Sequence, residues 1–214
     1  MQVLIIGATG HVGLETVRYG LEEGYRVKAF GRSTDKITLQ SDTLFVVKGD
    51  ATNRTDVAKA LHGVDVVILT HGAPLKADTI LHEPDLMKKS TALIVDEMAK
   101  AGVSRLICMT SLGAGDSEGH GRLIFQKFIE PVLLGRILKD RTAQEEIVRA
   151  AALPEWVIVR PTELTDGDSK PVRVIHDLDQ EEEPKMINRT DVARFLISLV
   201  ANKTHDSETI VITN

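Results

Sequence analysis

The sequence has few cysteines and few aromatic residues. Its only thiol is Cys108, so the chain cannot form an internal disulfide. Because this cysteine stands in the apolar run from Arg105 to Met109, we interpret it as a buried strand residue rather than a reactive thiol. Phe, Trp and Tyr together make up only 4% of the residues. A core must therefore be built mainly from Val, Ile, Leu and Ala, as in buried parallel sheets.

Long hydrophobic runs and basic clusters are also missing. No apolar run approaches the roughly 20 residues needed to cross a bilayer, and a first strand that begins at residue 2 leaves no room for a signal peptide. We therefore expect a cytoplasmic protein without a membrane partner. The 26 Lys and Arg residues stand against 31 Asp and Glu residues and form no cluster, which argues against nucleic acid as a partner. No metal site is predicted.

Strand and helix patterns alternate along the whole chain, which is typical of βαβ units. We predict a doubly wound, Rossmann-like α/β fold: a mainly parallel sheet with helices on both faces, in one domain over residues 1–214. The substrate site is expected in its C-terminal segments. The predicted strands cover residues 2–6, 26–30, 44–47, 64–69, 103–109, 156–160, 172–175 and 208–213. The predicted helices cover residues 11–23, 54–61, 84–101, 124–135, 139–152 and 189–202.

Three glycines follow the first predicted strand, in the segment QVLIIGATGHVG. Gly7 lets the chain turn off the strand, Gly10 has no Cβ to hold a pyrophosphate away, and Gly13 lets the next helix pack closely on the sheet. The free N–H groups at the start of that helix then face the phosphates. The segment therefore predicts a dinucleotide-binding loop made by Gly7, Thr9, Gly10, His11, Val12 and Gly13.

The GATGHVG pattern is similar to that of short-chain dehydrogenase/reductases of the extended and atypical groups. The segment LKDRTAQEEIVRAAALPEWVIVRPTELTDG, residues 138–167, resembles NAD(P)-binding, NmrA-like and biliverdin reductase B/flavin reductase-like proteins. In those proteins a helix with acidic residues precedes a strand that ends in an Arg-Pro pair. Residues 188–193 resemble their late helix start. The resemblance covers nearly all of the chain and implies an NAD(P)H cofactor.

The end of the second predicted strand bears on the choice of cofactor. The acidic residue that would bind a free ribose 2′-OH is missing there, and Arg32 and Ser33 stand in its place. A guanidinium can pair with a 2′-phosphate, which favours NADP, with NAD still possible. The alternative is an exposed loop arginine.

The resemblance implies further cofactor contacts at the other strand ends. Asp50 and Ala51 would lie beside the adenine, although a turn or capping role for Asp50 is the alternative. The residues implied beside the pyrophosphate, ribose and nicotinamide are Thr70, Gly72, Thr110 and Pro161.

Two positions depart from the pattern of the family. Thr162 follows the Arg-Pro pair where relatives usually have glycine, which alters the expected contacts to the carboxamide. Arg141 stands where many relatives have a lysine, and it is predicted to bind the cofactor ribose or an anionic substrate. An arginine cannot donate a proton at ordinary pH.

The catalytic pair of the usual mechanism is missing. Ser111 matches the serine that polarises a carbonyl in many short-chain reductases, but those enzymes also need a tyrosine with a lysine four positions later. Here Tyr19 and Tyr25 are the only tyrosines, and Glu23 and Ala29 follow them at that spacing. The proton-donor candidates left are Ser111, His71 and the loop histidine His120, of which Ser111 and His71 are the predicted catalytic residues.

Two functions remain open. The first is an NADPH-dependent reductase that passes hydride to a flavin-like, quinone-like or other conjugated acceptor, since such transfer needs little beyond two rings held face to face. The second is a non-catalytic NADP(H)-binding redox sensor or regulatory interaction protein. A small-molecule acceptor is the expected partner, and both a monomer and a homodimer are compatible with the sequence.

Overall fold

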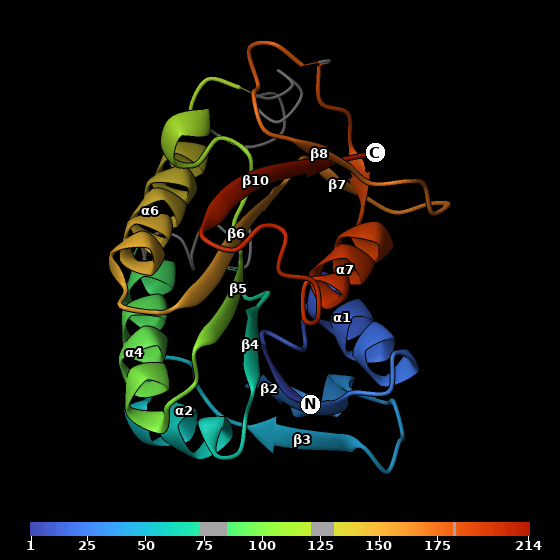
Figure 1. Cartoon of the computed structure of the whole chain (residues 1–214), viewed down its shortest axis with the longest axis vertical. Coiled ribbons are helices and arrows are strands. Elements are labelled where there is room, and N and C mark those ends of the chain that lie inside the picture. Colours follow the sequence, from blue (N-terminus) through green and yellow to red (C-terminus); the bar gives the residue numbers. More distant parts are fainter. Residues whose placement is uncertain (73–84, 121–130, 182) are drawn as a thin grey trace.

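The computed structural model describes residues 1–72, 85–120, 131–181 and 183–214, with no side-chain description at 131–133. An eight-stranded sheet in the order β3-β2-β1-β4-β5-β6-β10-β8 forms its centre (Figure 1). Neighbouring strands pair in parallel except β8, which runs antiparallel to β10. The strands are β1 (Gln2–Ile6), β2 (Arg26–Gly31), β3 (Leu44–Lys48), β4 (Val66–Leu69), β5 (Arg105–Met109), β6 (Glu155–Pro161), β8 (Arg173–Ile175) and β10 (Glu208–Thr213).

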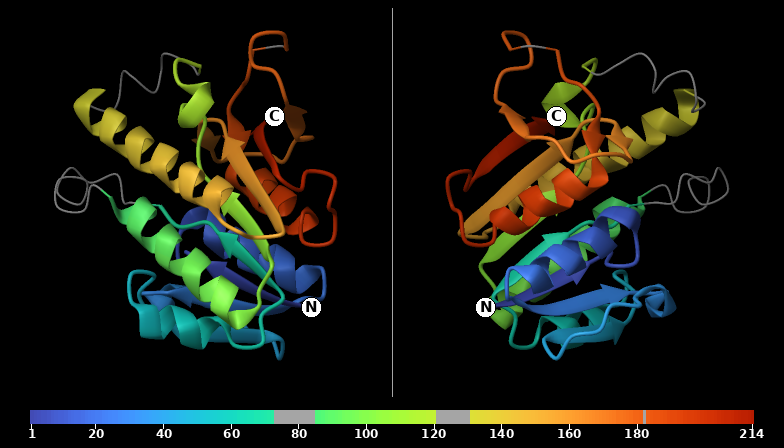
Figure 2. Two further views of the ribbon diagram at one scale, coloured as in Figure 1. Left: turned by 60° about the vertical axis from the view of Figure 1, so that its left-hand side comes forward. Right: turned by 90° about the vertical axis from the view of Figure 1, so that its right-hand side faces the viewer.

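Helices cover both faces of this sheet, as the two views of Figure 2 show. One face carries α1 (His11–Glu22) and α7 (Arg189–Ser198). The other carries α2 (Arg54–Leu61), α4 (Leu86–Ala101) and α6 (Pro131–Ala150).

The strands are apolar on both faces because both faces are covered. In β1, Val3 and Ile5 pack into the core under α1 and α7, whereas Leu4 and Ile6 pack into the opposite core. All four side chains are buried. The predicted fold class is confirmed.

Two short strands and one helix differ from the prediction. Strands β7 (Leu164–Thr165) and β9 (Ile187–Asn188) pair in a small separate sheet that was not predicted. The prediction of separate helices at 124–135 and 139–152 was wrong, because α6 runs unbroken from Pro131 to Ala150. Gly135 lies inside this helix, where a glycine costs only about 1 kcal/mol relative to alanine. Residues 124–130, and residue 84 of another predicted helix, lie outside the described residues.

The strand order reverses beside β1, which has β2 on one side and β4 on the other. In doubly wound sheets, ligands bind in the crevice outside the carboxyl ends of the strands at such a reversal. Within the described ranges, no helix is both long and apolar enough to cross a membrane.

Candidate functional site

The glycine loop begins at the carboxyl end of β1. Gly7 has a φ of +95°, a conformation that side chains rarely adopt. A Cβ there would lie 2.4 Å from the backbone N of His71. Gly7 therefore allows both the turn and the close approach of β1 to the chain that follows β4.

Gly13 lets α1 pack against this turn. A Cβ at Gly13 would lie 2.1 Å from the carbonyl oxygen of Gly7 and 2.9 Å from the Cα of Ala8. Both contacts are with backbone atoms, which cannot rotate away as a flexible side chain can. The predicted packing role of Gly13 is thus present in the geometry.

Gly10 faces open space instead. A Cβ there would meet only the carbonyl oxygen of Gly7, at 3.5 Å, which is ordinary contact. Gly10 is also the N-cap of α1, where no side chain accepts a hydrogen bond and no acidic residue stands in the first turn. The N-terminus of α1 is therefore electropositive and free of side-chain caps. His11 beside it is exposed, whereas Val12 packs into the core.

The end of β2 places Arg32 and Ser33 on the surface. A Cβ at Gly31 would lie 3.0 Å from the Cγ2 of Thr9, so the glycine loop and the end of β2 are in contact. Asp50 follows β3, and its Oδ1 accepts hydrogen bonds from the N and Oγ1 of Thr52 at 2.9 and 2.8 Å. Burial raises the pKa of Asp50, but the Thr52 hydrogen bonds and the charge of Arg32 outweigh it, and the net pKa is lowered.

The chain after β4 lies against this loop. The backbone N of Thr70 donates to the Ile6 carbonyl at 2.9 Å, and its Oγ1 donates to the same oxygen at 3.2 Å. Thr70 therefore ties the ends of β4 and β1 together. Gly72 is exposed, and a Cβ on it would lie 3.0 Å from Nη2 of Arg141. The missing Cβ at Gly72 thus makes room for a guanidinium.

Hydrogen bonds fix the orientation of the His71 ring. Its Nε2 lies 2.8 Å from the Oγ of Ser90, and that hydroxyl donates to the Leu86 carbonyl at 2.7 Å. Because Ser90 has a single proton, Nε2 of His71 carries the hydrogen and donates it to Ser90. Nδ1 is then a bare acceptor, and it is buried without a partner in the described part of the chain.

Burial, and then the charge of Arg141, lower the pKa of His71 to about 3. A histidine with such a pKa is neutral at physiological pH. Together with the Ser90 hydrogen bond, this makes His71 a neutral hydrogen-bonding group rather than a proton donor at neutral pH.

We expect the stabilising effect of the neutral imidazole to depend on pH. The unfolded chain binds a proton at His71 below about pH 6.5, whereas the folded chain does so only near pH 3. Stability from this group is therefore complete above about pH 6.5 and falls as the pH drops towards 3. Urea unfolding at pH values of about 4.5 and 7.5 should show a steeper loss for the wild type than for His71→Gln.

The exposed His62 offers a matched control for this measurement. His62→Gln should keep the pH dependence of the wild type. Identical pH slopes for the wild type and His71→Gln would show that His71 titrates normally in the folded chain.

Arg141 on α6 bridges the ends of β4 and β5. Its Nη2 donates to the His71 carbonyl at 3.3 Å, and its Nη1 donates to the Met109 carbonyl at 3.3 Å and to Oε1 of Gln144 at 2.7 Å. The side chain is buried. Burial lowers the pKa of Arg141, although an arginine stays charged at ordinary pH.

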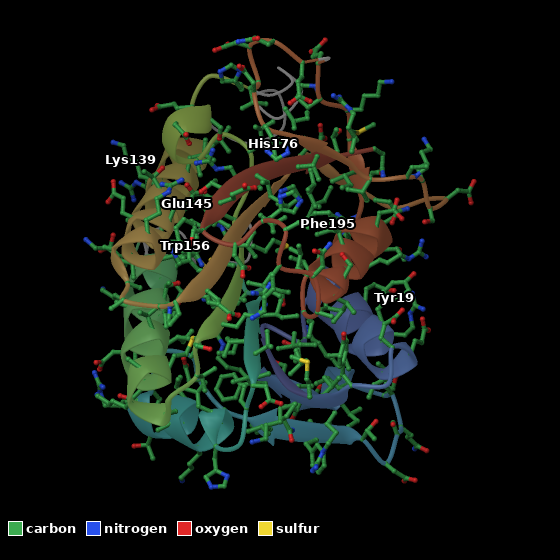
Figure 3. The ribbon with its side chains drawn as sticks, viewed as in Figure 1. Tyr19, Lys139, Glu145, Trp156, His176 and Phe195 are labelled. Carbon is green, nitrogen blue, oxygen red and sulfur yellow. The ribbon has the colours of Figure 1, made fainter. Side chains whose placement is uncertain are left out.

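A buried ion-pair network holds the ends of β5 and β6. Glu145, which Figure 3 labels on α6, is fully buried and accepts from the Oγ1 of Thr110 at 2.8 Å. It also accepts from Nε and Nη2 of Arg160, at 2.9 and 2.6 Å. Asp116, whose side chain is largely exposed, pairs with the same Nη2 of Arg160 at 2.5 Å. These contacts fix the segments that carry the predicted residues Ser111 and Pro161.

Ser111 follows Thr110 and is partly exposed. Its carbonyl accepts from Ala114 N at 3.2 Å, which begins the turn after β5. His120, further along this loop, has its Nε2 3.7 Å from Oδ1 of Asp179.

The residues after Pro161 show why the departure at Thr162 matters. The backbone N of Thr162 donates to the Ile212 carbonyl at 3.1 Å and is therefore used within the sheet. Its Oγ1 and the Oε2 of Glu163 are buried without partners in the described residues. Any carboxamide contact at Thr162 would thus come from its side chain rather than from its N–H.

The two tyrosines lie away from this edge of the sheet. Tyr19 is on α1, across the molecule from Glu145 (Figure 3), and its hydroxyl accepts from Nη2 of Arg194 at 3.0 Å. Tyr25 precedes β2, and its N donates to the Gly20 carbonyl at 3.0 Å.

Sequence reasoning missed the residues through which α6 supports the site. Glu145 and Gln144 of α6 were not singled out, and neither was Asp140, whose carboxylate accepts from the backbone N of Met87 and Lys88 at 2.8 and 2.9 Å. Ser90 of α4, the partner of His71, was missed as well. Acidic residues before an Arg-Pro strand end were the available signal. That signal did not say which carboxylate meets Arg160.

Comparison with known proteins decides the family. The sequence model of an NAD(P)H-binding family matches residues 7–203. The chain belongs to this family. The three glycines form a turn of the kind that dinucleotide-binding loops need, and at two of them a Cβ would collide with backbone atoms. The residues present therefore fit NAD(P)H.

The curated proteins with similar sequences include reductases. The chain is 27% identical over 159 residues to (4-alkanoyl-5-oxo-2,5-dihydrofuran-3-yl)methyl phosphate reductase of Streptomyces griseus, covering 74% of this chain and 46% of that protein. The chain spans between about a quarter and a half of the length of the curated relatives that it matches.

Solved structures with the same fold cover the chain completely. ChuY, an anaerobillin reductase of Escherichia coli, has a TM-score of 0.79 and 27% identity, over 100% of this chain and 97% of that one. A short-chain dehydrogenase/reductase of Veillonella parvula in complex with NADP has a TM-score of 0.78 and 17% identity, over 100% and 94% of the two chains. The second likeness shows the fold alone.

Proposed function

We propose that the chain is an NADPH-dependent reductase that passes hydride to a flavin-like, quinone-like or other conjugated small-molecule acceptor. The observation that carries the proposal is the open Gly10 at the uncapped start of α1, in a chain of an NAD(P)H-binding family. Reductases among the similar proteins support the reaction class. A single domain that acts in the cytoplasm as a monomer or homodimer is part of the proposal.

The proposed cofactor contacts follow the carboxyl edge of the sheet. The glycine loop holds the pyrophosphate, and Arg32 with Ser33 holds the 2′-phosphate. Asp50 and Ala51 lie beside the adenine. The nicotinamide half of the cofactor lies among Thr70, Gly72, Thr110, Arg141 and Pro161.

The side chains of the protein then only need to position the acceptor and hydrogen-bond to it. When bound, the reduced nicotinamide supplies the hydride. Ser111 and His71 border the acceptor, where the bare Nδ1 of His71 can accept a hydrogen bond. Because Nε2–H of His71 is engaged with Ser90, the proton taken up by the reduced acceptor comes from solvent.

Absorbance at the nicotinamide band tests the proposal, with purified protein, NADPH or NADH, and FMN as acceptor. We expect preferential oxidation of NADPH. No oxidation with any member of a panel of flavins, quinones and tetrapyrroles would contradict the reductase. In that case, tight binding with a large difference between oxidised and reduced cofactor would instead support the redox sensor, and equal affinities a binder that does not sense.

Arg32→Gln should remove the preference for NADPH. A hydrogen bond to a charged group contributes about 1.5–3 kcal/mol, so NADPH affinity should fall roughly tenfold to a hundredfold while NADH affinity stays unchanged. Calorimetric titration of both cofactors measures this. Arg26→Gln, at the exposed opposite end of β2, is the control and should alter neither affinity. An equal fall for NADPH and NADH would show that Arg32 does not read the 2′-phosphate.

A further inference from the structure

The described residues contain three buried arginines: Arg105, Arg141 and Arg160. Two of them each pair with two carboxylates. Arg105 contacts Glu155 and Asp206 at 3.1 and 2.7 Å, and Arg160 contacts Glu145 and Asp116.

Arg141 differs from both. In the described part of the chain, no carboxylate lies within the 4.0 Å of a salt bridge with its guanidinium. Its acceptors are two backbone carbonyls and the amide oxygen of Gln144, all of them neutral. These use three of its five N–H groups. A buried charge whose hydrogen-bond partners are all neutral is unfavourable. Asp140 and Glu145 act on Arg141 only from beyond ion-pair distance, and an anion bound beside it would compensate it directly.

The surroundings of Arg141 point to a ligand at this position. The guanidinium contacts the carbonyl of His71, two residues after the end of β4, and that of Met109, the last residue of β5. It lies under exposed Gly72. Independently, Nδ1 of His71 is buried without a partner. An unsatisfied acceptor and a cation without a paired carboxylate therefore occur together at the carboxyl edge of the sheet.

We propose that Arg141 anchors an acidic group of the acceptor, a carboxylate or a phosphate. This deepens the proposed function and rests on it. The phosphates of the cofactor are already assigned to α1 and to Arg32, on the other side of the strand reversal. Arg141 bridges β4 and β5, beyond those positions. The acceptor is thus an acidic conjugated molecule rather than a neutral one.

Binding of matched acceptors tests this without turnover. FMN and riboflavin share one ring system and differ by a phosphate. A naphthoquinone carboxylate and its methyl amide form a second pair. Equilibrium dialysis in the presence of NADP⁺ should show the acidic member of at least one pair bound about tenfold or more tightly, the ratio for one charge-assisted hydrogen bond.

Variants of Arg141 assign the preference to this side chain. Arg141→Gln should abolish the preference for the acidic member while leaving the affinity for the neutral member unchanged, and Arg141→Lys should retain part of it. Arg136→Gln, exposed on the same helix, is the matched control and should bind like the wild type. Thermal melting checks that each variant is folded. The comparison within the wild type needs no variant at all.

The other outcomes separate the two proposals. Equal binding of both members of each pair by the wild type overturns the anchor, and so does no binding of any member. Loss of NADP⁺ affinity in Arg141→Gln, with the acceptor preference intact, would assign the anion to the cofactor instead and also overturn it. Preferential binding of the acidic member without NADPH oxidation would retain the anchor and reject the reductase.

Discussion

Replacing Gly13 by alanine is expected to destabilise the chain by about 3 kcal/mol or more. The new methyl group would lie 2.1 Å from the Gly7 carbonyl oxygen and 2.9 Å from the Ala8 Cα. Because all of these atoms are backbone, α1 must move away from β1 to relieve the overlap. The free energy of unfolding in urea measures the loss.

Gly10→Ala should leave stability nearly unchanged and lower NADPH affinity instead. Its methyl group would meet only the Gly7 carbonyl oxygen at 3.5 Å, and the φ of −82° at Gly10 suits alanine. Stability should therefore stay near that of the wild type. If Gly10 faces the pyrophosphate, however, NADPH affinity should fall about tenfold or more.

Gly135→Ala serves as the control for both variants. Position 135 is helical and nothing lies within 4 Å of an added Cβ, so alanine should stabilise α6 by about 0.5–1 kcal/mol. Normal NADPH affinity in a folded Gly10→Ala variant would place the pyrophosphate elsewhere. A fully stable Gly13→Ala variant would contradict the packing role of Gly13.

Glu145→Gln is the second substitution with a large expected effect. It removes the charge that compensates Arg160, which is buried beside it at 2.6 Å. Breaking a buried pair by removing one partner costs about 3–5 kcal/mol, and we expect a loss of this size in urea unfolding. The amide NH₂ of the glutamine also replaces one acceptor oxygen, either Oε1, which Thr110 Oγ1 and Arg160 Nε share, or Oε2, which Arg160 Nη2 uses.

Glu146→Gln is the matched control, since Glu146 is the next residue on α6 and is exposed. Its effect should stay within about 0.5 kcal/mol. A similarly small effect of Glu145→Gln would mean that Asp116 alone compensates Arg160. The Glu145 network positions the turns at Ser111 and Pro161, so a folded Glu145→Gln variant should also lose NADPH oxidation if the chain is a reductase.

The sequence contained enough to predict the main sheet because that information is local. Strands that are buried on both faces appear in the sequence as apolar runs. Glycines directly after the first run indicate a tight turn where the backbone comes close to another group. All eight strands of the main sheet were predicted. The two-residue strands β7 and β9 were not, since segments this short carry no periodicity.

The glycine loop and the exposed Arg32 could also be located from spacing alone. The residues of a dinucleotide-binding loop are neighbours in the sequence, so a local pattern contains all of them. By contrast, the tautomer of His71 depends on Ser90, which lies 19 positions later on α4. No local pattern contains that hydrogen bond.

The charges at the site divide in the same way. Residue types and their order establish an NAD(P)H-binding α/β chain with an arginine at position 141 and an Arg-Pro pair at the end of a strand. Whether a buried arginine is compensated depends on which carboxylates α6 brings within 4 Å, and this is a property of packing between distant segments. Folding pairs Arg160 with Glu145 and leaves Arg141 among neutral oxygens.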